Sequence, residues 1–233
     1  MRVEIWLDLV CPYSYIGKRL FEEALENFSH REHVHVTYRS YVLYEHSLRI
    51  QPSQVVDGLF ANWNCETKEE KMNQLHTCAQ MFELDENCFH EKQLVNTLNA
   101  HRIIKYARTQ NKEKQMVDRI LKAHFFEEMD IDQLDCLQVL ATDIGLKEDE
   151  VHNILQTCKY TSDVRYDTSE AKELGAEYIP FIVINETYGV PSLYTPEEFL
   201  YILEGCWDET AERVAHKQYK ETTYCSAEGC TRS

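Results

Sequence analysis

Hydrophobic positions follow two different periods along this chain, a strand-like period at both ends and a helix-like period in the middle. Residues Arg2 to Asp8 and His33 to Val42 run apolar or alternate with polar residues, and both are rich in β-branched and aromatic side chains. This pattern predicts two strands, which flank a helix predicted over Tyr15 to Phe28. Strand character returns at Phe181 to Asn185 and again at Tyr188 to Val190. The two ends of the chain therefore predict α/β structure.

The middle of the chain, from about Ser53 to Ala176, predicts helices. Apolar residues recur there at intervals of three and four, as in Leu134, Leu137, Leu140, Ala141 and Ile144. Gly145 follows this run and predicts a left-handed C-cap. Further along, Thr195-Pro196-Glu197-Glu198 supplies an N-cap, an N1 proline and first-turn acids, which predict a helix through Leu203. For 233 residues, one domain with an insertion accounts best for this order.

The charge balance and the lack of long apolar runs exclude several partners. The chain carries 24 basic and 40 acidic residues, a net charge of −16, which repels nucleic acids and anionic membranes. No stretch approaches the roughly 20 apolar residues of a membrane helix, and the acidic, strand-like N-terminus is unlike a signal peptide. We therefore expect a cytoplasmic protein with neither nucleic-acid nor membrane partners.

The cysteines indicate thiols rather than a disulfide framework or a metal site. Nine is an odd number, so at least one thiol stays free or pairs with another molecule. In a reducing compartment most of them should be thiols. Five are scattered without metal-ligand spacing, and we expect no metal and mostly buried roles for them: Cys65, Cys78, Cys88, Cys136 and Cys158.

One cysteine, Cys11, lies where the first predicted strand gives way to the first predicted helix, in the motif Cys-Pro-Tyr-Ser. A thiol at a helix N-terminus faces unpaired N–H groups and the positive end of the helix dipole, which lower its pKa. This placement predicts an exposed and reactive thiol. The competing interpretation is an ordinary turn, because proline suits the first turn of any helix.

Ser14 occupies the position where dithiol motifs of the C-x-x-C type carry their second cysteine. The usual internal resolution of a mixed disulfide is therefore absent at this motif. We expect the Ser14 hydroxyl to donate a hydrogen bond to the Cys11 thiolate instead, which further favours ionisation.

Three segments, in order along most of the chain, carry a resemblance to a known family. They read DLVCPYSYIGKRLFEEAL, NTLNAHRIIKYARTQNK and AKELGAEYIPFIVINETYGVPSLYTPEEFLYILE. Together they resemble the DsbA family, specifically its FrnE-like branch of dithiol-disulfide oxidoreductases and isomerases. The Cys-Pro-Tyr-Ser motif is also similar to the S-P-Y-S form of the related kappa-class glutathione transferases and 2-hydroxychromene-2-carboxylate isomerases. The resemblance implies an α/β thioredoxin fold interrupted by an all-helical insertion.

The resemblance also implies roles for individual residues and a division of the chain. Cys11 would be the nucleophile and Pro180 a cis-proline facing it, while Pro12, Tyr13 and Ile179 shape the site. The implied parts are a first thioredoxin-like part at 1–45, a helical insertion at 46–160, a second thioredoxin-like part at 161–208 and a C-terminal tail at 209–233.

Two features outside the motif are weaker candidates. Cys225 and Cys230 in the tail are separated by four residues, and they are either idle thiols on a disordered terminus or a redox pair that resolves Cys11. A zinc site is the least favoured interpretation of this pair, since a structural site needs four ligands. His101, in the central segment, faces the active-site groove or is an ordinary helix histidine.

Three classes of function follow. The first is a thiol-disulfide oxidoreductase or isomerase that acts on a disulfide-containing protein or a small thiol. The second is a glutathione-dependent transferase or isomerase of the kappa-like type. The third is a binding or adaptor protein without catalysis, favoured if Cys11 is buried with an ordinary pKa. We expect no bound cofactor, and glutathione or another low-molecular-weight thiol as the co-substrate.

Overall fold

Strands from both ends of the chain form one sheet. The structure is a computed structural model, and it describes residues 1–43, 95–176, 178–191 and 194–222, together with residues 73, 80, 225–226 and 229–230. The four-stranded sheet has the order β2-β1-β3-β4, and its strands are β1 (Arg2–Leu7), β2 (His35–Ser40), β3 (Phe181–Ile184) and β4 (Tyr188–Pro191). Strand β1 pairs in parallel with β2 and antiparallel with β3, which pairs antiparallel with β4. The four predicted strands are confirmed.

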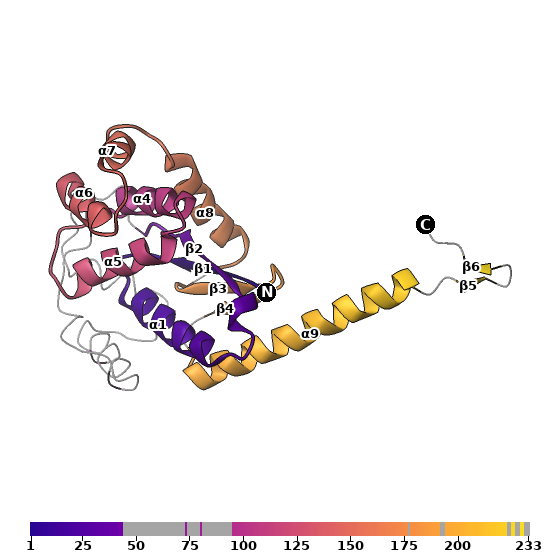
Figure 1. The fold of residues 1–233 in the computed structure, drawn as a ribbon. Helices are drawn as coiled ribbons and strands as arrows, with labels where there is room; N and C mark the ends of the chain where they lie inside the picture. Colours follow the sequence, from indigo (N-terminus) through magenta and orange to yellow (C-terminus); the bar gives the residue numbers. More distant parts are fainter. Residues whose placement is uncertain are drawn as a thin grey trace.

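Helices flank the sheet, as Figure 1 shows. In chain order they are α1 (Pro12–Asn27), the short 3-10 helix η1 (Arg31–His33), α4 (Leu98–Thr109), α5 (Glu113–Phe125), α6 (Leu134–Asp143), α7 (Glu148–Gln156), α8 (Thr161–Glu173) and α9 (Pro196–Thr222). A two-stranded ribbon follows, β5 (Cys225–Ser226) with β6 (Gly229–Cys230). Of residues 53–94, which the sequence predicts to be helical, the structure describes residues 73 and 80, both as helix, and the rest of that prediction lies outside the described residues.

Alternation along β1 separates the two faces of the sheet. Val3, Ile5 and Leu7 are fully buried in the larger core cluster, which also contains residues of α1 and α9. Trp6 points to the opposite face, where it packs with Ala171 of α8 and others in a smaller cluster. Because side chains alternate along a strand, β1 is buried between α8 on one side and α1 with α9 on the other.

Local capping chemistry ends α6 and begins α9 as predicted. Gly145 has a φ of +73°, its N–H donates to the Thr142 carbonyl, and the next N–H donates to the Ala141 carbonyl. This is a Schellman motif, in which glycine takes the left-handed position. At α9, the Thr195 hydroxyl accepts from the Glu198 N–H at 3.2 Å, and the Glu198 carboxylate accepts from the Thr195 N–H at 2.8 Å.

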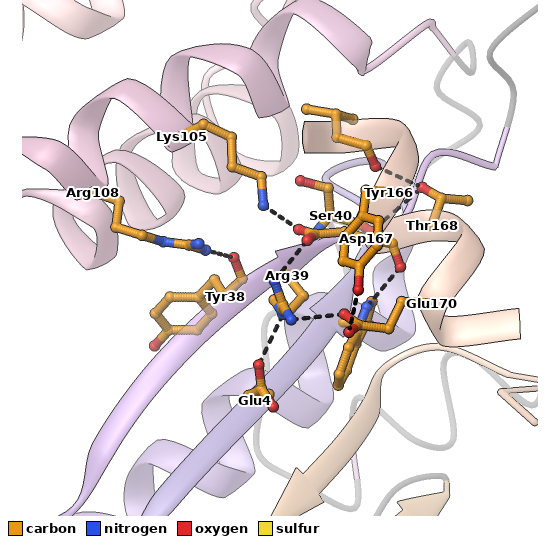
Figure 2. A network of polar contacts seen from close by, with 12 residues as sticks. Glu4, Tyr38, Arg39, Ser40, Lys105, Arg108, Tyr166, Asp167, Thr168 and Glu170 are labelled. Carbon is orange, nitrogen blue, oxygen red and sulfur yellow. Dashed lines mark hydrogen bonds and ion pairs between the residues drawn. The ribbon is translucent and has the colours of Figure 1, made fainter. Parts of the chain in front are cut away.

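Asp167 joins α8 to β2 and α4 through its buried carboxylate (Figure 2) and to β1 through its backbone carbonyl. Asp167 accepts hydrogen bonds from Arg39 at 2.8 Å and from the Ser40 N–H at 2.8 Å, and it forms an ion pair with Lys105. Its backbone carbonyl accepts from the Trp6 indole at 2.9 Å. Because Asp167 is 1% exposed and Lys105 is 6% exposed, these charges are shielded from water and depend on one another.

Strand β2 is an edge strand, and side chains from α4, α5 and α8 cover its outer backbone groups. The Tyr38 N–H donates to Glu113 at 3.2 Å, and Arg108 donates to the Tyr38 carbonyl at 2.7 Å. The Ser40 N–H is bonded to Asp167 in the same way. These side chains satisfy groups that a neighbouring strand would otherwise pair with.

Removing the Asp167 carboxylate should destabilise the fold strongly. Burial lowers the pKa of Lys105, and Asp167 opposes that shift, so Asp167→Ala leaves Lys105 and Arg39 without their shared anion. We expect a loss of about 3 to 5 kcal/mol in the free energy of unfolding, measured by urea denaturation. Adding Lys105→Met should recover part of it. In the exposed Glu150–Lys159 pair, Glu150→Gln should cost at most about 1 kcal/mol. Equal effects at the two sites would contradict this assignment.

Candidate functional site

Cys11 is the N-cap residue of α1 and lies four residues after Leu7, where β1 ends. The helix begins at Pro12, three residues earlier than predicted, and Cys11 has extended backbone angles of −85° and 115°. Its N–H donates to the Asp8 carbonyl at 3.2 Å. The thiol is nevertheless 1% exposed. The predicted helix N-terminus is confirmed, and the predicted exposure is wrong because the surrounding core covers the sulfur.

The segment before β3 lies against this thiol. The Ile179–Pro180 peptide bond is cis, and the Cys11 thiol donates to the Ile179 carbonyl with an Sγ–O distance of 3.9 Å. Pro12 and Pro180 are buried, and Ile179 is half-buried. The structure thus brings together two segments that are 168 residues apart in the sequence.

Burial decides the acidity of the thiol. It raises the pKa of Cys11 from 9.0 to about 11, because the interior solvates a thiolate poorly. The N–H and hydroxyl of Ser14 and the N–H of Tyr13 lower the pKa, whereas the charge of Asp8 raises it. The helix N-terminus therefore acts in the predicted direction but is outweighed. The prediction of a lowered pKa is wrong, and the resting thiol is neutral.

Ser14 links the thiol to the end of β1. The residue is fully buried, and its Oγ accepts a hydrogen bond from the Asp8 N–H at 3.2 Å. Because Asp8 uses the acceptor side of this oxygen, the hydroxyl proton is left for the Cys11 sulfur. The contact between Ser14 and Cys11 lowers the pKa of the thiol, which agrees with the predicted hydrogen bond.

The carboxylate of Asp8 is a feature that the sequence reasoning missed. Asp8 is fully buried, accepts from the Leu43 N–H at 2.8 Å, and accepts from the Thr97 hydroxyl at 2.8 Å. His101 of α4 has its Nε2 at 3.8 Å from the same carboxylate. The available signal was an acidic residue at the end of an apolar strand, three positions before Cys11.

His101 and Tyr13 lie in the interior rather than on a surface groove. His101 is 1% exposed and Tyr13 is 5% exposed. Of the two interpretations of His101, its burial on α4 favours the histidine within the helix over a position on an open groove. Tyr13 contributes its backbone N–H to the environment of Cys11.

The tail cysteines lie away from Cys11. Helix α9 packs along α1, with Phe199 against Phe21 near its start and Trp207 against Phe28 at the far end of α1. It therefore runs away from Cys11, and the β5–β6 ribbon lies beyond its end (Figure 1). The backbone places Cys225 opposite Cys230 in that ribbon.

The other described cysteines show no common role. Cys206 is buried, Cys136 is half-buried and Cys158 is exposed. Cys65, Cys78 and Cys88 lie outside the described residues, so the expectation that most of the five scattered cysteines are buried stays a prediction. Within the described ranges, no group of three histidine, cysteine or acidic residues is arranged to hold a metal ion. None of the helices in those ranges is long and apolar enough to span a membrane.

Comparisons with known proteins match this geometry to one family. The family model for the DSBA-like thioredoxin domain matches residues 2–203. A solved structure of a probable DsbA oxidoreductase from Streptomyces coelicolor is similar with a TM-score of 0.76 and 28% identity, over 99% of this chain and 98% of that one.

Two further proteins are similar at lower identity. The cytosolic disulfide reductase DsbM from Pseudomonas aeruginosa, solved with GSH, has a TM-score of 0.63 and 15% identity over 88% of this chain and 98% of its own. An uncharacterized protein, YwbO of Bacillus subtilis (strain 168), is 24% identical over 80% of this chain and 88% of its own length. The similarity to DsbM extends to the fold alone.

Alkylation of Cys11 should report the raised pKa. Between pH 9 and 11 the rate with iodoacetamide, followed at the Cys11 peptide by mass spectrometry, should keep rising, because a thiol of pKa about 11 is only about 1% ionised at pH 9. In guanidinium the same rate should level off above pH 9. Asp8→Asn removes a charge that raises the pKa and should move the native rise to lower pH. A native rate that levels off at pH 9 would contradict the burial argument.

Proposed function

Because this chain belongs to the DSBA-like thioredoxin domain family, we propose that it is a thiol-disulfide oxidoreductase or isomerase that acts through a single reactive cysteine, Cys11. The observation that carries the proposal is the position of the Cys11 thiol, at the N-cap of α1 and 3.9 Å from the carbonyl that precedes cis-Pro180. The thiol supplies the nucleophile, the N–H groups at the start of α1 favour its ionised form, and the Ile179 carbonyl is a hydrogen-bond acceptor for an extended substrate.

The reaction proceeds through a mixed disulfide. The Cys11 thiolate attacks one sulfur of a substrate disulfide, a new S–S bond forms to Cys11, and the other sulfur leaves as a thiolate that takes up a proton. Ser14 has no thiol with which to release the substrate internally. An outside thiol therefore completes the cycle, and we propose glutathione or another low-molecular-weight thiol as the co-substrate. A cytoplasmic setting would supply such a thiol.

Substrate access requires the sulfur to be uncovered. Cys11 is 1% exposed, and its thiol donates to the Ile179 carbonyl. Loss of the thiol proton removes that donor and frees the carbonyl for an extended substrate. The substrate is a disulfide-containing protein or a small thiol compound. An extended segment of a protein substrate would pair with the backbone of Ile179. We propose the FrnE-like branch on the three segments that resemble it, whereas the Cys-Pro-Tyr-Ser motif, with Ser14 in place of a second cysteine, departs from that branch.

A glutathione-dependent transferase or isomerase is the alternative. In that mechanism residue 11 holds a glutathione thiolate by a hydrogen bond, and a serine hydroxyl would serve as well as a thiol. The cysteine at this position favours the oxidoreductase, because a thiol is the better nucleophile. The third class, a binding or adaptor protein, is favoured by a buried and poorly ionised thiol, which is what burial and the charge of Asp8 give Cys11. The Cys11→Ser test below separates it from the oxidoreductase, because an adaptor shows no exchange activity to lose.

Cys11→Ser should abolish thiol exchange. We expect glutathione-dependent reduction of bis(2-hydroxyethyl) disulfide, coupled to NADPH through glutathione reductase, to fall to background in this variant because the nucleophile is gone. Cys206→Ser changes another buried cysteine, on α9, and should keep full activity. Full exchange activity in Cys11→Ser would overturn the assignment. Glutathione transfer or isomerisation that survives in Cys11→Ser would favour the alternative.

Glutathione loaded on Cys11 should stay until an outside thiol arrives. We expect slow, equal release in the full chain and in Cys225→Ser/Cys230→Ser, because α9 carries the tail away from Cys11. Ser14→Cys should release glutathione quickly and form an internal disulfide. Mass spectrometry of the intact chain follows each species. Faster release that depends on the tail cysteines would make them the resolving pair.

A further inference from the structure

A buried polar cluster lies behind the Cys11 thiol. Asp8, Thr97 and His101 are each at most 1% exposed. One Asp8 oxygen accepts from the Thr97 hydroxyl at 2.8 Å and lies 3.8 Å from the His101 Nε2, while the other accepts from the Leu43 N–H. Nothing in the exchange reaction described above uses the imidazole of His101.

The His101 Nε2 has no hydrogen-bond partner among the residues that the structure describes. A buried nitrogen without a partner costs free energy, so its environment calls for an explanation. At 3.8 Å the Asp8 carboxylate is too far for a good hydrogen bond but close enough to stabilise a positive charge on the ring.

The two cationic side chains of α4 nearest His101 in sequence have partners of their own. Lys105, one turn along α4, pairs with Asp167 of α8, and Arg102 donates to carbonyls at the end of α7. Three other titratable residues belong to this region: Asp8 after β1, Cys11 at the N-cap of α1, and Tyr41 after β2. Both burial and Asp8 raise the pKa of Tyr41, so its hydroxyl stays protonated. Asp8 is the one carboxylate within 4 Å of His101 in the described part of the chain.

Ionisation of Cys11 creates an electrostatic problem that His101 is placed to solve. The backbone of Asp8 is hydrogen-bonded to Cys11 and to Ser14, and the charge of Asp8 raises the pKa of the thiol. A thiolate at Cys11 therefore adds a second negative charge to a buried site, which is disfavoured. A proton on His101 restores a net charge of −1. We propose that His101 takes up a proton as Cys11 loses one, with Asp8 holding the two sites in register.

This inference rests on the proposed function for its purpose but not for its test. During exchange, the Cys11 S–H bond breaks and the His101 ring gains one proton. The net charge of the buried site therefore stays the same. The thiolate electron pair forms the new S–S bond, the substrate S–S bond breaks, and the leaving thiolate takes up the proton that His101 gives back. No oxidant or reductant beyond the substrate disulfide is needed. His101 is a positioning residue, because it acts on Cys11 through Asp8.

The pH profile of Cys11 alkylation tests the coupling. Two interacting groups titrate in two macroscopic steps, so the wild-type rate with iodoacetamide should show a pH-independent shoulder below its final rise toward pH 11. His101→Gln should remove the shoulder and slow alkylation at pH 7 by about tenfold, equivalent to one pKa unit. In an Asp8→Asn background the same change should have a smaller effect. Alkylation does not require exchange activity, so failure of the proposed function would leave this result intact.

A matched control and a second measurement keep the test independent of folding. His124 is another buried histidine, on α5, and His124→Gln should keep the shoulder. In the unmutated chain, capping Cys11 with methyl methanethiosulfonate should change the NMR titration of the His101 imidazole and leave that of His124 unchanged. Superimposable alkylation profiles for wild type and His101→Gln, or an unchanged His101 titration after capping, would overturn the inference.

Discussion

The buried carboxylate of Asp8 is the constraint on which the arrangement of the site depends. The backbone carbonyl and N–H of Asp8 hold Cys11 and Ser14 at the start of α1. Its side chain holds the segment after β2 through Leu43 and the start of α4 through Thr97. A buried charge persists only when its oxygens are satisfied, so these contacts fix four stretches of chain around one point. The geometry of the thiol follows from them.

Two opposing physical effects act on the ionisation of the Cys11 thiol, and their relative magnitudes decide its protonation state at rest. Helix N–H groups and the Ser14 hydroxyl favour a thiolate, whereas burial and Asp8 favour the neutral thiol. A change in pKa from 9.0 to about 11 corresponds to about 3 kcal/mol against the thiolate. A resting chain therefore protects its nucleophile, and reactivity depends on what substrate binding changes in the covering groups. Such protection suits a thiol that has no partner cysteine at position 14 to shield it.

Local chemistry could be predicted from the sequence, whereas burial could not. The strands followed from alternation, and the caps at Gly145 and Thr195 followed from residues a few positions apart. Cys11 also contacts Ile179, 168 residues away, and no local pattern reports such a contact. Helix α9 continues past the predicted Leu203 to Thr222, so Gly205 lies inside the helix. Asp8 was visible as an acid at a strand end, but its partners arrive from distant segments.

The covered edge of β2 also bears on how the molecule behaves toward its own copies. An uncovered edge strand offers N–H and carbonyl groups on which another chain can build, the first step of sheet-to-sheet aggregation. Here Glu113, Arg108 and Asp167 occupy the outer groups of Tyr38 and Ser40 with charged side chains. A foreign strand would have to displace these charged side chains before it could pair with Tyr38 or Ser40. The same residues that tie the helices to the sheet therefore act as gatekeepers, and they favour colloidal stability at high protein concentration.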